Sequence, residues 1–170
     1  MPANVEIKAR VRDFAAIAAR AESLSHTPAQ VILQEDTFFH TPRGRLKLRQ
    51  LSAEHGQLVY YERPDLNGPK RSDYFIFETS EPESLKTVLS LALGVRGVIR
   101  KVRHLYMVGQ TRIHLDQVEG LGDFMELEVV LQTVQSDAEG QTIAQNLMAE
   151  LNVLQSDLVD SAYIDLLEKE

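Results

Sequence analysis

The chain has 170 residues, of which 44% are hydrophobic and 25% are charged, and this composition is typical of a single globular domain. It contains no cysteine, which excludes disulfide bonds, thiolate metal sites and cysteine nucleophiles. The formal net charge of −7 argues against a surface that binds nucleic acid. We therefore expect one domain, spanning residues 1–170, that binds no nucleic acid.

The N-terminal segment MPANVEIKAR lacks the apolar centre of a signal peptide. No uninterrupted apolar run approaches the roughly 18 residues that indicate a transmembrane helix. We expect a soluble, cytoplasmic protein that does not associate with a membrane.

The first expected element is a strand over residues 4–11, where apolar and charged residues alternate. Asp13 is suited to cap a helix that runs to about Ser25. Further strands are expected at 30–40, 45–51, 57–63, 71–79, 98–108, 111–118 and 123–132. Further helices are expected at 80–93, 137–151 and 158–167. Because helices follow only some of the eight strands, the pattern indicates an α+β fold rather than a doubly wound parallel sheet.

The polar faces of these strands carry a repeated charge pattern. Cations prevail on most strands, while carboxylates gather on the first strand and the last two. The positions concerned are Glu6, Lys8, Arg10, Lys47, Arg49, Arg63, Lys101, Arg103, Arg112, His114, Asp116, Glu126 and Glu128. A solvated outer face would explain any one strand. If helices cover the apolar faces and the sheet closes into a barrel, however, the charged faces line an interior wide enough for one small ligand.

Several cations inside a barrel would require an anion, because an unpaired buried charge costs on the order of several kcal/mol. The ligand would therefore be a polyanion, and arginine and lysine together suit phosphate. The carboxylates Glu6, Asp116, Glu126 and Glu128 are hard oxygen donors with no expected His or Cys cluster, which favours Mg²⁺ or Mn²⁺ over Zn²⁺. We expect His114 to be a structural histidine paired with a carboxylate rather than a general base.

The segment Val5–Arg10 resembles the N-terminal ExExK strand of the CYTH superfamily, also called the triphosphate tunnel metalloenzymes. The resemblance continues in the same order over nearly the whole chain, at residues 34–39, 46–49, 101–103, 113–116, 120–128 and 161–167. The segments 120–124 and 161–167 are most similar to class IV adenylyl cyclases. Thiamine triphosphatases and inorganic triphosphatases belong to the same superfamily.

The resemblance implies a closed, eight-stranded antiparallel β-barrel with helices packed on its outside. Its metal ligands, for Mg²⁺ or Mn²⁺, would be Glu6, Asp116, Glu126 and Glu128. Its catalytic residues would be Glu6, Lys8 and Arg103. Its phosphate-binding residues would be Lys8, Arg10, Lys47, Arg49, Arg63, Arg71, Lys101, Arg103 and Arg112.

Asn4 stands where the family pattern has its first acidic residue. An amide oxygen can still bind a metal ion, but it supplies no charge and cannot act as a base. Two reactions stay open for an enzyme of this kind, which are cyclisation of ATP to cyclic AMP and pyrophosphate, and hydrolysis of ATP, thiamine triphosphate or tripolyphosphate. The alternative is a non-catalytic module that binds a triphosphate or nucleotide. A homodimer is possible for either.

Overall fold

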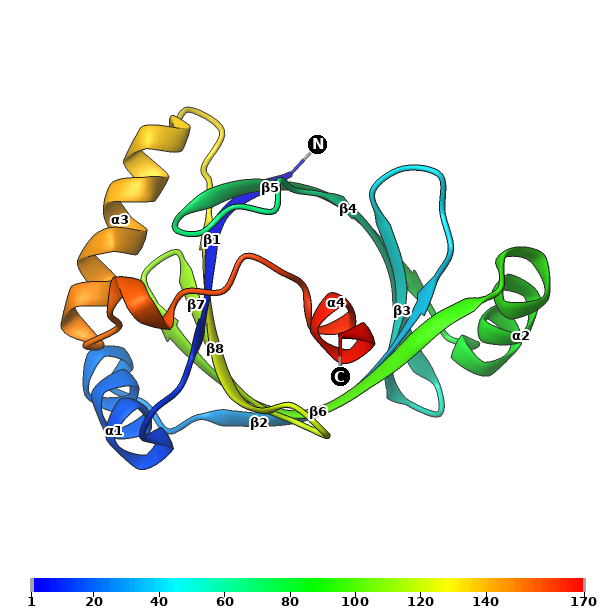
Figure 1. Cartoon of the computed structure of the whole chain (residues 1–170), viewed down its shortest axis with the longest axis horizontal. Helices are drawn as coiled ribbons and strands as arrows, with labels where there is room; N and C mark the ends of the chain where they lie inside the picture. Colours follow the sequence, from blue (N-terminus) through cyan, green and yellow to red (C-terminus); the bar gives the residue numbers. More distant parts are fainter. Residues whose placement is uncertain (1, 170) are drawn as a thin grey trace.

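The computed structural model describes residues 2–169, so that Met1 and Glu170 of the expected domain lie outside it. Eight antiparallel strands close into a barrel in the order β1-β5-β4-β3-β2-β6-β7-β8 (Figure 1). This confirms the expected α+β barrel. The strands are β1 (Ala3–Arg10), β2 (Gln30–Phe39), β3 (Arg45–Ser52), β4 (His55–Glu62), β5 (Lys70–Thr79), β6 (Val95–Val108), β7 (Thr111–Val118) and β8 (Gly122–Val130).

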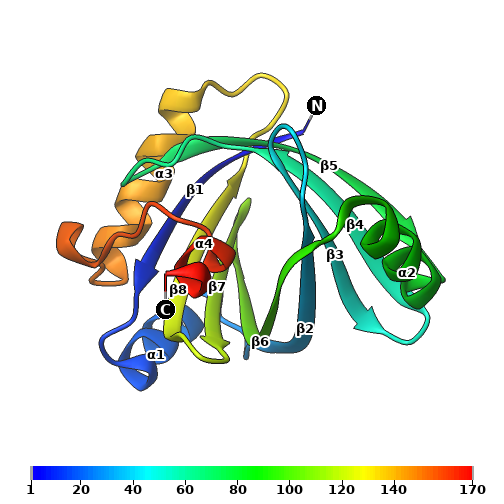
Figure 2. The ribbon, with the colours of Figure 1, turned by 45° about the vertical axis from the view of Figure 1, so that its right-hand side comes forward.

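Two helices cover one side of the barrel, and a third lies on the opposite side (Figure 2). The first two are α1 (Phe14–Ser25) and α3 (Asp137–Glu150), which pack on the outer faces of β1, β6, β7 and β8. The third is α2 (Pro82–Leu93), which contacts β2, β3 and β4. Local signals set where the helices begin. The Asp13 side chain accepts a hydrogen bond from the backbone N–H of Ala16, and Ser136 forms a reciprocal capping box with Glu139.

The main apolar core lies between the barrel wall and α1 with α3, not inside the barrel. Alternate residues of the strands point outward into it, because successive side chains of a strand face opposite sides. The buried members are Ile7, Ala9, Ile17, Ala21, Tyr106, Ile113, Leu115, Met125, Leu127, Leu147, Met148 and Leu151. The other residues of the same strands are thereby directed into the barrel. None of the helices within residues 2–169 is long and apolar enough to cross a membrane.

The C-terminal region differs from the expected helix over 158–167. It forms a short 3₁₀-turn at Gln155–Asp157, an extended segment, and then the helix α4 (Tyr163–Glu168). The extended segment pairs with the end of β1, since Val159 N–H donates to the Lys8 carbonyl at 2.9 Å and Leu158 bridges to Ala9. Backbone pairing with a distant strand therefore replaces the first turns of the expected helix.

The helix α4 crosses one opening of the barrel (Figure 1). Its residues Tyr163 and Ile164 are buried against inward-facing apolar residues, which are Phe38, Ile99, Val118 and Phe124. The strand β6 also begins three residues earlier than expected, so that Gly97 lies within it. A Cβ atom at Gly97 would collide with the Ile164 side chain. The absence of a side chain at Gly97 therefore makes room for α4, which closes this end of the barrel.

Candidate functional site

A cavity of about 520 Å³ occupies the barrel interior and is lined by residues from all eight strands. Seven of the nine expected phosphate-binding residues line it, namely Lys8, Lys47, Arg49, Arg63, Lys101, Arg103 and Arg112. The structure does not bring Arg71 or Arg10 to them. Arg71 pairs with outward-facing Val5 in the β1–β5 ladder and forms ion pairs outside the barrel with Asp73 and Asp137. Arg10 is exposed at the end of β1, with its guanidinium 5.0 Å from the ring centre of Phe124.

Asp36, to which the sequence pattern assigns no role, pairs with three of these cations. It accepts two hydrogen bonds from Arg49, both at 2.8 Å, and lies 3.4 Å from the Lys47 Nζ and 3.5 Å from the Lys101 Nζ. Burial would raise the pKa of Asp36, but Arg49, Lys47 and Lys101 together hold it well below its usual value. Part of the counter-charge for these cations therefore comes from the protein itself. A single aspartate on a strand does not by itself predict pairing with three cations, because all three lie on other strands that only the folding of the sheet brings near it.

Asp116 is held by Arg103 and Tyr163. Arg103 donates two hydrogen bonds to it, at 2.8 and 2.7 Å, and the Tyr163 hydroxyl donates a third at 2.8 Å. Both carboxylate oxygens are thus engaged, and Asp116 is fully buried. It lies outside the group of candidate metal ligands found within residues 2–169. In this arrangement Asp116 orients Arg103, an expected catalytic residue that lines the cavity.

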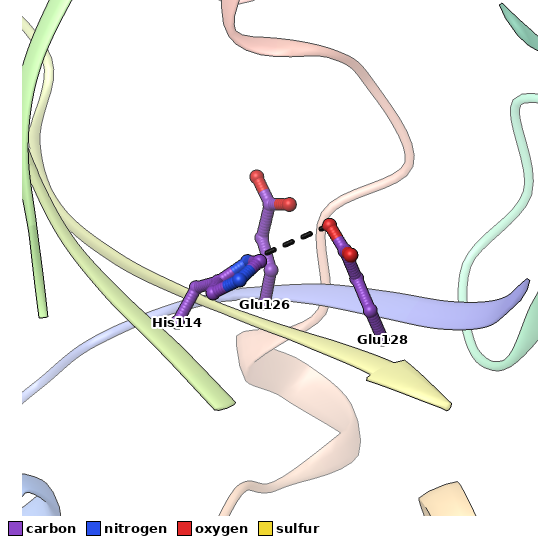
Figure 3. A group of neighbouring side chains, drawn as sticks. All are labelled: His114, Glu126 and Glu128. Carbon is purple, nitrogen blue, oxygen red and sulfur yellow. Dashed lines mark ion pairs between the residues drawn. The ribbon is translucent and has the colours of Figure 1, made fainter. Parts of the chain in front are cut away.

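That group of candidate ligands consists of Glu126, Glu128 and His114 (Figure 3). One ligand atom from each residue lies within 4.8 Å of the other two. Burial would raise the pKa of Glu126, but Lys8 and Arg103 hold it well below its usual value, so this carboxylate is ionised. Burial lowers the pKa of His114 to about 4, so the imidazole is neutral at pH 7 and can offer a lone pair. His114 was expected to pair with a carboxylate, and its Nδ1 lies 3.5 Å from Glu128 Oε1. Its place among the candidate metal ligands was not expected.

Two further residues of β1 lie beside this group. Glu6 is opposite Glu128 in the β1–β8 ladder, and its Oε1 accepts a hydrogen bond from Arg63 at 2.9 Å. Asn4 lines the cavity, and its buried Oδ1 has no hydrogen-bond partner among residues 2–169. Neither residue belongs to the group whose ligand atoms lie within 4.8 Å of one another, but both present oxygen atoms to the same cavity. The residues present therefore fit a metal ion.

Two buried lysines lie near the closed end of the cavity. The Lys8 Nζ is 3.7 Å from Glu126 Oε1 and 3.7 Å from the ring centre of Tyr163. Burial lowers the pKa of Lys8 to about 8 and that of Lys101 to about 7. A bound polyanion would favour the charged form of both lysines. The Tyr163 ring contacts both ammonium groups.

The opposite end of the cavity also carries apolar surface. Its lining includes four apolar side chains, from Ile32, Leu51, Ile76 and Leu105. They belong to the ends of β2, β3, β5 and β6 that lie away from α4. Apolar surface therefore lies toward the opening that α4 does not cross, beside Arg112 and His55.

Comparison with known protein families identifies the family that shares this sequence. The CYTH domain family model matches residues 2–163. The chain belongs to the CYTH family. This confirms the resemblance seen in the sequence.

This CYTH protein is also similar to individual proteins and solved structures. A Methanocaldococcus jannaschii protein, MJ0240, named provisionally as an adenylate cyclase, is 23% identical over 96% of this chain and 97% of its own. The solved structure of the PH1012 protein from Pyrococcus horikoshii has a TM-score of 0.83 at 27% identity, covering 96% of this chain and 98% of that one. HpAC1 from Hippeastrum, a proposed adenylyl cyclase described as having a dominant triphosphatase activity, has a TM-score of 0.65 at 19% identity, covering 94% and 91%.

Proposed function

We propose that this CYTH protein is a divalent-metal-dependent enzyme that acts on an organic triphosphate bound inside the barrel. One observation carries the proposal, which is that seven cations and the Glu126–Glu128 pair face one cavity of about 520 Å³. Metal ions held by a few carboxylates and completed by phosphate oxygens are typical of phosphoryl-transfer sites.

The charge balance of the interior supports an anionic ligand. Seven cations line the cavity, against the four carboxylates Glu6, Asp36, Glu126 and Glu128 that line it and Asp116 buried behind Arg103. With Lys8 and Lys101 both protonated, two positive charges are therefore in excess. A triphosphate that carries one divalent cation would offset this excess, and the guanidinium groups can bind its oxygens in pairs.

We assign the phosphate chain to the closed part of the cavity, where Lys8, Lys47 and Lys101 lie. A Mg²⁺ or Mn²⁺ ion bound by Glu126 and Glu128 would stabilise charge on the phosphate oxygens. Arg103 would contribute a charge fixed in direction by Asp116, which needs no reorganisation during the reaction.

We assign the organic part of the substrate to the open end. The side chains of Ile32, Leu51, Ile76 and Leu105 offer apolar surface there, which an inorganic polyphosphate would not use. Contacts to the nucleoside at this end would fix the orientation of its ribose, which cyclisation requires in order to place the 3′-oxygen in line with the α-phosphorus. This favours cyclisation of ATP to cyclic AMP, in which the 3′-oxygen attacks the α-phosphorus and pyrophosphate leaves. The names of the relatives favour the same reaction, and the HpAC1 description makes hydrolysis the second candidate.

Product analysis by phosphorus NMR tests the proposal, with ATP, thiamine triphosphate and tripolyphosphate offered separately in Mg²⁺ and in Mn²⁺. We expect pyrophosphate and cyclic AMP from ATP, and faster turnover of ATP than of tripolyphosphate. Release of orthophosphate would show a triphosphatase instead. Tight binding of all three without turnover would support the alternative of a binding module, which Asn4 favours because its amide cannot serve as a base.

A further inference from the structure

His114 has a buried ring nitrogen that the protein leaves without a hydrogen bond. The side chain is 5% exposed, and Nδ1 lies 3.5 Å from Glu128 Oε1. This is within the range of an ion pair, but it does not satisfy hydrogen-bond geometry, and no other partner occurs in the described part of the chain. A buried polar atom without a partner in a native site requires an explanation, and a bound ion is one.

The strand register places this nitrogen among carboxylates. His114 lies directly opposite Glu126 in the β7–β8 ladder, and Glu128 is the next inward-facing residue of β8. All three side chains converge (Figure 3), with one ligand atom of each within 4.8 Å of the other two. Ligands bound to one ion at about 2.0–2.2 Å cannot lie more than about 4.4 Å apart, so small rotations about side-chain bonds would suffice.

The two carboxylates are only loosely engaged by neighbouring cations. Glu126 lies 3.7 Å from Lys8 and 3.9 Å from Arg103, and Glu128 lies 3.4 Å from Arg112. By contrast, the paired guanidinium contacts to Asp36 and Asp116 measure 2.7–2.8 Å. Glu126 and Glu128 therefore keep oxygens available for an ion, whereas Asp36 and Asp116 do not.

We propose that His114 is a metal ligand that acts with Glu126 and Glu128, and that its nitrogen makes the site prefer Mn²⁺ to Mg²⁺. Mn²⁺ is the first member of the first-row series that binds nitrogen as well as oxygen ligands, whereas Mg²⁺ prefers oxygen ligands and retains its water. The inference rests on the proposed function only in placing a metal ion at this site. It adds a nitrogen ligand that the carboxylate pattern of the sequence does not contain.

The test is Mn²⁺ binding to the full chain after treatment with a chelator, without any triphosphate. Pulsed electron paramagnetic resonance detects coupling between bound Mn²⁺ and a coordinated ¹⁴N nucleus, and a Mn²⁺ titration gives the affinity. We expect ¹⁴N coupling in the wild type. In His114→Ala the coupling should vanish and Mn²⁺ affinity should fall at least about tenfold, while Mg²⁺ affinity changes much less.

Two further variants serve as controls for the effect of His114→Ala. His55→Ala removes a histidine at the open end of the same cavity and should keep both the ¹⁴N coupling and the Mn²⁺ affinity. His114→Gln keeps a polar side chain, so that a folded protein lacking the coupling can be obtained even if His114→Ala unfolds. Circular dichroism verifies folding in each case.

Mn²⁺ bound without ¹⁴N coupling in the wild type, coupling that survives in both His114 variants, or no Mn²⁺ binding would overturn the inference. Triphosphate turnover in Mg²⁺ alongside any of these results would leave the proposed function standing. Conversely, the protein could show ¹⁴N coupling that depends on His114 but turn over no triphosphate. This result would support His114 as a metal ligand and contradict the proposed enzyme activity.

Discussion

At the scale of single residues, the barrel interior is organised by carboxylates that orient cations. Asp116 engages Arg103 through two hydrogen bonds, and Asp36 engages Arg49 in the same way. A paired guanidinium is fixed in direction, because its planar fork matches the carboxylate. These residues therefore shape the site without being free to bind a metal ion themselves.

Replacing Asp116 by asparagine should destabilise the fold and weaken triphosphate binding. The change leaves Arg103 buried without its counter-charge, and breaking a buried pair in this way costs about 3–5 kcal/mol. Urea unfolding measures the loss, and calorimetric titration with tripolyphosphate measures the binding. Glu150→Gln, an exposed carboxylate in the last turn of α3, is the control and should change neither quantity. A fully stable Asp116→Asn protein would contradict the role given to this pair.

Triphosphate affinity should fall as pH rises from about 7 to about 9. Burial lowers the pKa of Lys101 to about 7 and that of Lys8 to about 8, so the free protein loses both charges over this range. A bound polyanion restores the charges, and binding must therefore take up protons, which becomes less favourable at higher pH. Calorimetry in two buffers of different ionisation enthalpy measures the uptake.

Lys101→Arg provides the matched comparison for this pH dependence. Arginine stays charged at all these pH values, so the uptake and the slope of affinity against pH should both decrease. Equal slopes in the wild type and in Lys101→Arg would show that Lys101 does not titrate on binding.

At the scale of elements, α4 and the extended segment before it determine which end of the barrel is closed. Asp165 of α4 accepts hydrogen bonds from Arg45 at 2.9 Å and from Arg96 at 2.6 Å. Tyr163 of α4 donates a hydrogen bond to Asp116 inside the barrel. The C-terminal region therefore closes one end of the barrel and contributes Tyr163 to the site.

Gly97→Ala should displace α4, because the added Cβ would collide with Ile164. We expect a lower midpoint of thermal unfolding and faster proteolysis after residue 160, with the barrel otherwise folded. The double variant Gly97→Ala, Ile164→Ala removes the collision. Its loss of stability should be smaller than the sum of the two single losses, since residues in contact are not additive. If the stability losses of the two single variants add exactly in the double variant, the effect of Gly97→Ala does not come from contact with Ile164.

At the scale of the whole molecule, the interior is a compromise between stability and binding. Seven cations in a closed barrel carry desolvation costs that five carboxylates offset only in part. A ligand that completes the charge balance should therefore bind tightly to the folded state and stabilise the fold as a whole.

Tripolyphosphate at about 100 times its Kd should stabilise the protein by about 2.7 kcal/mol. For a chain of this size, this corresponds to a rise of about 5–10 °C in the midpoint of thermal unfolding. Differential scanning calorimetry measures the shift, and orthophosphate at equal ionic strength is the control. An equal shift with both anions would indicate a general salt effect rather than binding in the barrel.

Much of the fold was predictable because alternation along a strand is a local property. The charged positions on β1, β3, β6 and β8 predicted the inward face, since side chains two residues apart lie on the same side. The prediction was wrong for Arg71. Its side chain faces outward because Arg71 pairs with the outward-facing Val5. A shift of one residue in register moves a side chain to the other face of the sheet.

The sequence by itself determined the eight strands, the charge of their inner faces and the CYTH family of this protein, because periodicity and motif order are contained in the chain. Only the tertiary structure decided which charges meet. Asp36 gathers three cations, Asp116 engages Arg103 and Tyr163, and His114 joins Glu126 and Glu128. These groups come from strands and helices far apart in the chain, and only barrel closure and the docking of α4 bring them within contact distance.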